Sequence, residues 1–222
     1  MTSRASTLTL YAIVDARCAS PRGRGISGAP LGSVAVGRAR FVFERASPKE
    51  VTPEAIKGFD VVVRRLASRC PAVLPFRFGS KARSPAALSE LFAESESAVA
   101  NALDRVRNHV QFTHRVWGER SSPLRARPST GPGTQWLDAR AASQRMPEVA
   151  PLRKAVTSIA RELRVERVDR PPLLGTLYAL VPRSKVTRYV RAAAKEVDDL
   201  ARADIRVETS GPWPAYAFAD LW

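Results

Sequence analysis

Residues 8–14 read Leu-Thr-Leu-Tyr-Ala-Ile-Val, and the interpretation of this stretch decides what kind of fold the chain begins. A run rich in Leu, Tyr, Ile and Val that ends in a loop of Pro, Gly, Ser and Arg predicts a buried strand. The rival interpretation is a signal peptide, but the apolar run is short, and Asp15 and Arg17 follow it without a good cleavage site. We therefore expect the chain to open on the first strand of a folded domain.

Two helix starts follow downstream, each marked by a hydroxyl residue before a proline. Thr52-Pro53 opens the first and Ser84-Pro85 opens the second, so the hydroxyl side chain is expected to cap the helix. Because apolar residues recur every three or four positions, one face of each helix is expected to be buried. The residues expected inward are Ile56, Phe59, Val63 and Leu66, and then Leu88, Leu91, Phe92, Val99, Leu103 and Val106.

Extended segments separate these helices and define a first domain. They are predicted at 33–36 and 39–44, with a turn at Gly37, and at 72–78. Residues 108–117 alternate apolar and polar positions, which predicts the last strand of a domain spanning residues 1–118. Residues 119–133 are dense in Ser, Pro, Gly and Arg and are expected to form a linker.

The second domain is expected to span residues 134–209, and residues 210–222 an aromatic tail packed back on the body. Helices are predicted from residue 134 to about Leu163 and over 184–202, the latter with Val186, Tyr189, Val190, Val197 and Leu200 inward, and strands at 164–169, 173–181 and 205–208. Helices and strands without strict alternation predict the α+β class, as two small mixed sheets related to the ferredoxin-like or split βαβ plan.

The net charge of +15, from 36 basic and 21 acidic residues, would attract nucleic acid, an anionic membrane or an acidic partner. The arginines are nevertheless scattered in pairs, such as Arg64/Arg65 and Arg125/Arg127, without the run or stripe that nucleic-acid binders favour. We expect no sequence-specific nucleic-acid binding. A basic nucleic-acid-binding protein is kept as the alternative function.

No motif predicts a catalytic, cofactor or metal site. Residues 23–28 match G-x-G-x-x-G, but Pro30 and a β-like segment follow where the dinucleotide fold needs a helix N-terminus. His109 and His114 have an odd spacing on a strand, so they face opposite sides and cannot share a metal ion. Cys18 and Cys70 are expected to be small, partly buried hydrophobes of a cytoplasmic protein, and no stretch is apolar for long enough to span a membrane.

Two aromatic segments stand out instead. Residues 71–79 read Pro-Ala-Val-Leu-Pro-Phe-Arg-Phe-Gly, and Pro75 suits an edge strand or a strand end because it lacks a backbone donor. Residues 210–218 read Ser-Gly-Pro-Trp-Pro-Ala-Tyr-Ala-Phe and are too apolar to remain in water, so they are expected to pack on the body. The residues taken as structural or partner-binding motifs are Leu74, Pro75, Phe76, Arg77, Phe78 and Gly79, with Gly211, Pro212, Trp213, Pro214, Tyr216 and Phe218.

Several of these segments, taken in order, resemble the gas vesicle protein F/L family. The strand at 10–14, the stretch Ile-Ser-Gly-Ala-Pro-Leu at 26–31 and the helix after Thr52 are similar to the family's opening. Residues 73–79 look like its Leu-Pro-aromatic-or-Leu-Arg-Phe-Gly signature.

The same resemblance continues to the end of the chain. Residues 133–140 are similar to the family's Gly-x-x-Tyr-Leu-x-x-Arg helix start, with Trp136 where Tyr is usual. Residues 211–218 look like its terminal Gly-Pro-Trp-Pro-Pro-Tyr-Ser-Phe, with Ala215 and Ala217 in place of Pro and Ser.

The resemblance implies two α+β domains, a tail that returns to the body, and a role in gas vesicle assembly without catalysis. The implied partners are the small apolar shell protein and other vesicle accessory proteins, the implied location is the cytoplasm and the gas vesicle, and the protein alone is expected to be a monomer. A soluble binder could cover the apolar surface that a shell subunit exposes before it polymerises.

Overall fold

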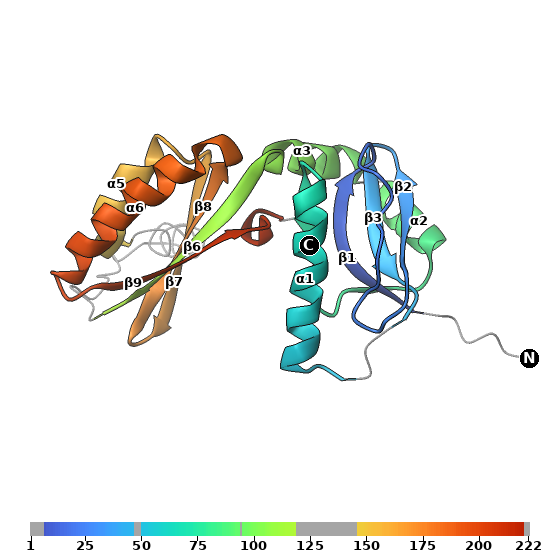
Figure 1. Ribbon diagram of the computed structural model, residues 1–222, viewed down its shortest axis with the longest axis horizontal. Helices are drawn as coiled ribbons and strands as arrows, with labels where there is room; N and C mark the ends of the chain where they lie inside the picture. The colour runs from blue at the N-terminus through green and yellow to red at the C-terminus, as the bar shows by residue number, and fades with distance from the viewer. Residues whose placement is uncertain (1–6, 47–49, 94, 119–145, 220–222) are drawn as a thin grey trace, which may run out of the picture. The chain divides into compact units, whose positions relative to one another are not determined.

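The computed structural model describes residues 7–46, 50–93, 95–118 and 146–219, and the chain divides into two compact units (Figure 1). Unit 1 comprises residues 1–109 and 213–222, and unit 2 comprises residues 110–212. Each unit contains one sheet with helices packed on it, which confirms the α+β class.

The sheet of unit 1 is built around the strand at the start of the chain. Its strands are β1 (Leu8–Asp15), β2 (Leu31–Val36), β3 (Ala39–Glu44), β4 (Val73–Pro75) and the short β5 (Lys81–Ala82). The order is β2-β3-β1-β4, and β1 is antiparallel to β3, β4 and β5. Every residue of β1 is buried, as expected of a strand covered on both faces, so the strand prediction at 8–14 is confirmed.

Helix α1 (Pro53–Arg69) covers one face of this sheet. The predicted cap is present, because Thr52 Oγ1 accepts a hydrogen bond from the backbone N–H of Ala55 at 3.2 Å. Phe59 and Val63 are buried as predicted. Ile56, which was also expected inward, is 48% exposed. It lies in the first turn of α1, which extends beyond the strands (Figure 1).

Helices α2 (Pro85–Ala93) and α3 (Glu96–Val106) cover the opposite face of the sheet. The neighbouring residues Val42 and Phe41 of β3 point to the two faces in turn. Val42 packs in the cluster under α1, whereas the Phe41 ring lies 4.3 Å from the ring of Phe92 on α2. The cap from Ser84 is confirmed by its bond from the Ala87 N–H at 3.1 Å, but Leu91, expected inward, is 65% exposed.

The sheet of unit 2 contains β6 (His109–Trp117), β7 (Glu162–Arg170), β8 (Leu173–Pro182) and β9 (Arg206–Trp213) in the order β7-β8-β6-β9. β6 was expected in the first domain, whereas it pairs with β8 and β9 in the sheet of unit 2. Alternation predicts a strand but not its neighbours. Val110 and Phe112 of β6 pack in the core of unit 2.

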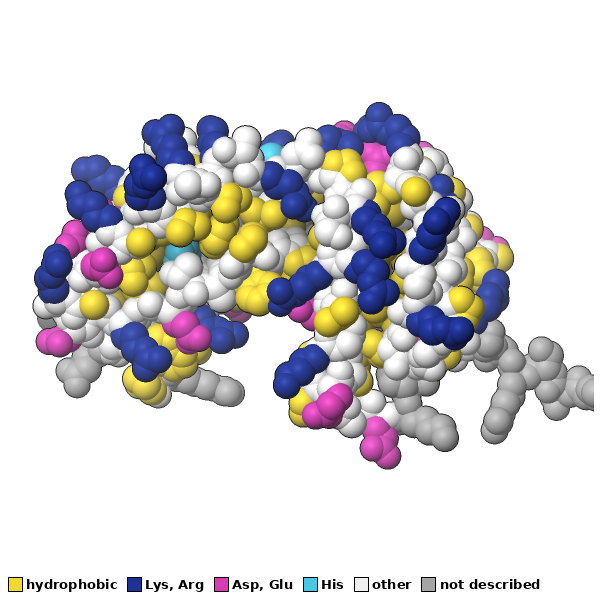
Figure 2. All heavy atoms as spheres, in the orientation of Figure 1, with side chains coloured by type: hydrophobic (Ala, Val, Ile, Leu, Met, Phe, Trp, Pro, Cys, Tyr) yellow, Lys and Arg dark blue, Asp and Glu magenta, His cyan; other side chains and the backbone are white. Residues whose placement is uncertain are grey.

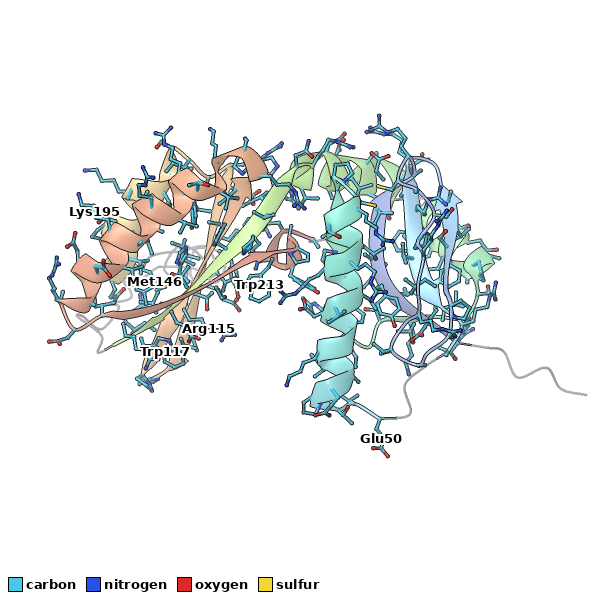
Figure 3. The ribbon with its side chains drawn as sticks, in the orientation of Figure 1. Glu50, Arg115, Trp117, Met146, Lys195 and Trp213 are labelled. Carbon is cyan, nitrogen blue, oxygen red and sulfur yellow. The ribbon has the colours of Figure 1, made fainter. Side chains whose placement is uncertain are left out.

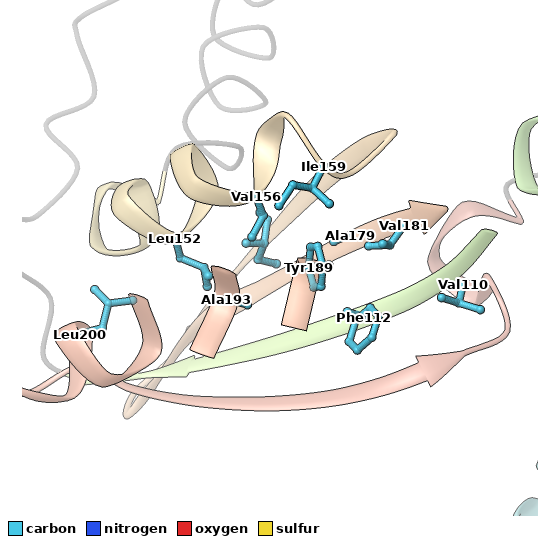
Figure 4. Close-up of a cluster of buried hydrophobic side chains, with 11 residues drawn as sticks. Val110, Phe112, Leu152, Val156, Ile159, Ala179, Val181, Tyr189, Ala193 and Leu200 are labelled. Carbon is cyan, nitrogen blue, oxygen red and sulfur yellow. The ribbon is translucent and has the colours of Figure 1, made fainter. Parts of the chain in front are cut away.

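Helices α5 (Ala150–Thr157) and α6 (Val186–Ala201) cover one face of this sheet, and the turns η1 (Pro147–Val149) and η2 (Arg183–Lys185) precede them. Figure 4 shows the cluster between helices and sheet, with Leu152, Val156 and Tyr189 among its members. The first predicted helix was expected to reach Leu163, but α5 ends at Thr157. Val190, expected inward on α6, is 45% exposed.

One polar side chain lies inside this apolar cluster. His114 is fully buried, and its Nε2 lies 2.6 Å from the Tyr189 hydroxyl while Nδ1 lies 2.8 Å from Thr209 Oγ1. Burial lowers the pKa of His114 from 6.5 to about 4. Burial disfavours the charged imidazolium, and both nitrogens of the neutral ring have a hydrogen-bonding partner.

The unit boundaries differ from those expected. Unit 1 ends at His109 rather than at residue 118, and the chain re-enters it at Trp213. Residues 210–213, expected in the tail, belong to β9. The predicted linker 119–133 and the helix start at 134–140 lie outside the described residues.

The split βαβ plan was expected for both halves. The described elements of unit 2 follow the order strand, helix, strand, strand, helix, strand. The described part of unit 1 begins with three consecutive strands before its first helix and does not follow that order.

Candidate functional site

The first motif, at residues 71–79, forms the end of the unit 1 sheet and the turn that leaves it. The strand is shorter than expected, since β4 stops at Pro75, and Pro75 ends an outermost strand as its missing donor predicted. Leu74 and Phe76 are 2% and 4% exposed, and the Phe76 N–H donates to the Tyr11 carbonyl at 3.0 Å. This part of the motif is therefore core.

The rest of the first motif reaches the surface. The Ser80 N–H donates to the Arg77 carbonyl at 3.1 Å, which closes a four-residue turn. Gly79 occupies the third position with φ of 90°, a conformation that favours glycine. Arg77 and Gly79 are exposed, and Phe78 is half-buried with its ring edge-on to Phe59 at 5.6 Å.

The second motif leaves β9 and folds onto α1 and α3 of unit 1. Phe218, in the turn η3 (Tyr216–Phe218), is fully buried, and its carbonyl accepts a hydrogen bond from Arg105 Nη2 at 2.6 Å. Trp213 lies at the end of β9 (Figure 3), and the guanidinium of Arg64 lies 3.9 Å from its ring centroid. The Tyr216 hydroxyl donates to Asp60 Oδ1 at 3.1 Å.

Asp60 and Arg64 link the two aromatic contacts of the tail. They are one helical turn apart on α1, and Arg64 Nε donates to Asp60 Oδ2 at 2.5 Å. Asp60 thus accepts from Arg64 and from Tyr216, while Arg64 also covers Trp213. Burial, followed by the nearby charge and hydrogen bond of Asp60, raises the pKa of Tyr216, so its hydroxyl stays a neutral donor.

The two motifs therefore meet in unit 1, although more than a hundred residues separate them in the sequence. Phe78 and Tyr216 both pack against the cluster under α1, and β4 contacts η3. We name this place the tail junction and define it as Asp60, Arg64, Phe78, Trp213 and Tyr216. Not every motif residue belongs to it, since Gly211 and Pro212 lie in unit 2.

Sequence reasoning missed the residues that hold the tail. The i,i+4 spacing of Asp60 and Arg64 on a helix could have indicated their ion pair. The sequence does not indicate that the tail contacts them. No sequence pattern indicated that Arg105 contacts the tail. Its contact is to a backbone carbonyl 113 residues away.

The glycine-rich loop at residues 23–28 packs against a buried polar pair. The Tyr11 hydroxyl donates to Glu44 Oε1 at 2.9 Å and accepts from the Ile26 N–H at 2.8 Å. A Cβ at Gly25 would lie 2.1 Å from Glu44 Oε2 and 2.6 Å from the Tyr11 oxygen. Glycine is needed there for close approach, which is a structural explanation of the motif.

Among the described residues, no group of three or more His, Cys, Asp or Glu side chains could hold a metal ion. Cys18 and Cys70 are free thiols, and both pack against the cluster under α1. Burial raises the pKa of Cys70 to about 12, so this thiol stays protonated. None of the helices in the described ranges is long and apolar enough to cross a membrane.

Comparison with known proteins gives consistent matches. The family model described as gas vesicle synthesis protein GvpL/GvpF matches residues 8–220. Gas vesicle protein L from Streptomyces sp. (strain CB03234) is 25% identical over 191 residues, which cover 76% of this chain and 70% of that protein.

Two solved structures share the fold. The crystal structure of gas vesicle protein GvpF from Microcystis aeruginosa superposes with a TM-score of 0.72 at 13% identity, covering 97% of this chain and 100% of that one. GvpF from Anabaena sp. PCC7120 gives 0.73 at 12% identity, covering 98% and 97%. At these identities the two structures support the fold alone.

Proposed function

Because the chain belongs to the gas vesicle GvpL/GvpF family, we propose that it is a non-catalytic assembly factor that binds the vesicle shell protein through unit 1. It would act in the cytoplasm and at the growing vesicle, together with other accessory proteins. The observation that carries the proposal is the family match over residues 8–220, which includes both units and the tail.

Unit 1 is favoured as the binding part because it exposes apolar side chains. Of the five large hydrophobic residues that are exposed in the described chain, four are in unit 1. Three lie on α1 or just before it, namely Val51 at 75%, Ile56 at 48% and Val61 at 53% exposed. We name these three residues the α1 apolar surface, and Figure 2 shows hydrophobic side chains exposed over this helix.

The chemistry of this surface suits a shell subunit. A subunit that polymerises through apolar faces must keep those faces out of water until it is incorporated. Single exposed apolar residues are ordinary on a protein surface, and Ile56 and Val61, five positions apart on α1, point roughly 140° away from each other. The proposal therefore takes each of them as a separate apolar contact on the helix. Val61 is three positions before Arg64 of the tail junction on α1, a spacing at which helical side chains are neighbours, so this contact would lie close to the tail.

We expect the full-length double variant Ile56→Gln, Val61→Gln to retain its fold and lose most of its binding to co-expressed shell protein. Each substitution removes apolar area that contact would bury, at about 25 cal/mol per Å². Together they should weaken binding by roughly tenfold, the equivalent of about 1.4 kcal/mol. The measurement is the amount of shell protein that co-purifies with the tagged chain.

The matched control is Val190→Gln, which changes a valine of similar exposure in unit 2, at 45%. Equal loss with the control, or no loss with the double variant, would refute the placement of the binding surface on α1. Melting curves of all three proteins check that the fold is intact.

A further inference from the structure

Basic residues gather on the helical layer of unit 2. Residues 150–161 and 183–195 contain eight Lys or Arg and no Asp or Glu. All eight are exposed, including Arg153 and Lys154 on α5 and Arg188 and Arg191 on α6. In the linear sequence these two segments are separated by two strands, so the clustering becomes visible only in the folded unit.

The fold joins the two segments into one surface. Helices α5 and α6 pack beside each other on the same face of the sheet, with their buried side chains in one cluster. Their outer sides therefore form a continuous face that is basic as far as Lys195, beyond which the end of α6 carries Glu196, Asp198 and Asp199. Figure 2 shows dark blue side chains gathered over this pair of helices, and Figure 3 labels Lys195 on α6. We name this surface the α5–α6 basic face.

This arrangement is unfavourable for helix α6. Neither α5 nor α6 has an acidic residue in its first turn, and Lys185 and Arg188 place positive charge at the N-terminal end of α6. The helix dipole favours the opposite sign there. Arg188 also has Lys185 and Arg191 three residues away on either side, a spacing at which like charges repel. A partner that supplies negative charge would relieve both effects.

We infer that the α5–α6 basic face docks an acidic segment of a partner protein. Val190 supports a protein partner, because it is 45% exposed among the basic residues and offers an apolar contact beside the charges. The inference rests on the proposed role as an assembly factor, which needs a second surface if it holds an accessory protein while α1 holds the shell subunit.

Nucleic acid fits this face less well. Proteins that bind single strands place aromatic side chains where bases can stack. The one aromatic residue of these two segments, Tyr189, is fully buried in the core. Without exposed aromatic residues, this face could attract nucleic acid only through its charge, and the net charge of +15 would attract phosphates to the whole protein in the same way.

The test uses the full-length protein and poly-L-glutamate as the probe. The face variant is Lys185→Gln, Arg188→Gln, Arg191→Gln, and the control variant is Lys57→Gln, Lys81→Gln, Arg83→Gln, whose three residues are exposed in unit 1. Both lower the net charge by the same three units. We expect the face variant to bind poly-L-glutamate about tenfold more weakly, since exposed charge pairs each contribute modestly.

The control variant should stay within about twofold of the wild type, because salt screens distant charges. Equal weakening in both variants would overturn the inference, since overall charge would then explain the binding. A DNA duplex that loses as much affinity for the face variant as poly-L-glutamate does would overturn it in favour of nucleic acid. Binding of shell protein by the same variants is expected to be unchanged, so failure here and failure of the proposed function give different results.

Discussion

The variant Phe218→Ala is expected to lower the free energy of unfolding by about 3–5 kcal/mol, the usual cost of truncating a buried Phe with its cavity. Phe218 is fully buried in unit 1, with 0% of its surface accessible, and its carbonyl accepts a hydrogen bond from Arg105. At about 2–4 °C per kcal/mol for a chain of this size, the melting temperature should fall by roughly 6–20 °C.

Thermal melts of the protein without any partner measure this effect. Trp213→Ala is expected to cost less, because Trp213 is only half-buried, with the guanidinium of Arg64 lying 3.9 Å from its ring centroid. Val51→Ala, at an exposed position, serves as the control with no expected shift. If Phe218→Ala melted like the wild type, the tail would be a free docking peptide and its anchoring role in unit 1 would be wrong.

Acidification from pH 7 to pH 4 is expected to destabilise unit 2 through His114. Its folded pKa of about 4 lies below the ordinary 6.5, so the unfolded chain binds the proton more readily between these values. The stabilisation is complete above about pH 6.5 and is lost as the pH falls towards about 4. A pKa shift of this size corresponds to a loss of about 3 kcal/mol in the free energy of unfolding once His114 is protonated.

Denaturant melts at a series of pH values, with a probe of unit 2, measure this dependence. In His114→Gln the slope of stability against pH between about 4.5 and 6.5 should flatten, although the variant is less stable at pH 7. Asp15 does not interfere in this range, because its hydrogen bonds with Arg17 hold its carboxyl pKa well below the usual value. A slope in the variant equal to that of the wild type would show that His114 is not the titrating group.

The sequence was informative wherever the signal was local. Caps at Thr52 and Ser84 and the apolar spacing of α1 depend on residues a few positions apart, and the structure confirms them. The α+β class followed from the order of elements. Ile56, Leu91 and Val190 were assigned to buried faces by spacing alone, but each is exposed. Spacing indicates the direction in which a helical side chain points and not whether another element covers it.

Long-range partners could not be predicted. The alternation at 108–117 predicted β6 but not that its neighbours would be β8 and β9. The two aromatic motifs were both found, yet their meeting at the tail junction depends on Asp60 and Arg64, whose tail contacts have no counterpart in the local sequence. Whether the motif residues bind a partner stays a prediction.

The central claim is that this chain binds the gas vesicle shell protein, and co-purification tests it most directly. The full-length tagged chain is co-expressed with the shell protein and washed at low salt and then at high salt. Because the proposed contact is apolar, the shell protein should remain bound in about equal amount after both washes, since salt screens charges but does not weaken apolar burial. Elution of the chain without shell protein at low salt, or its release by high salt, would contradict the account.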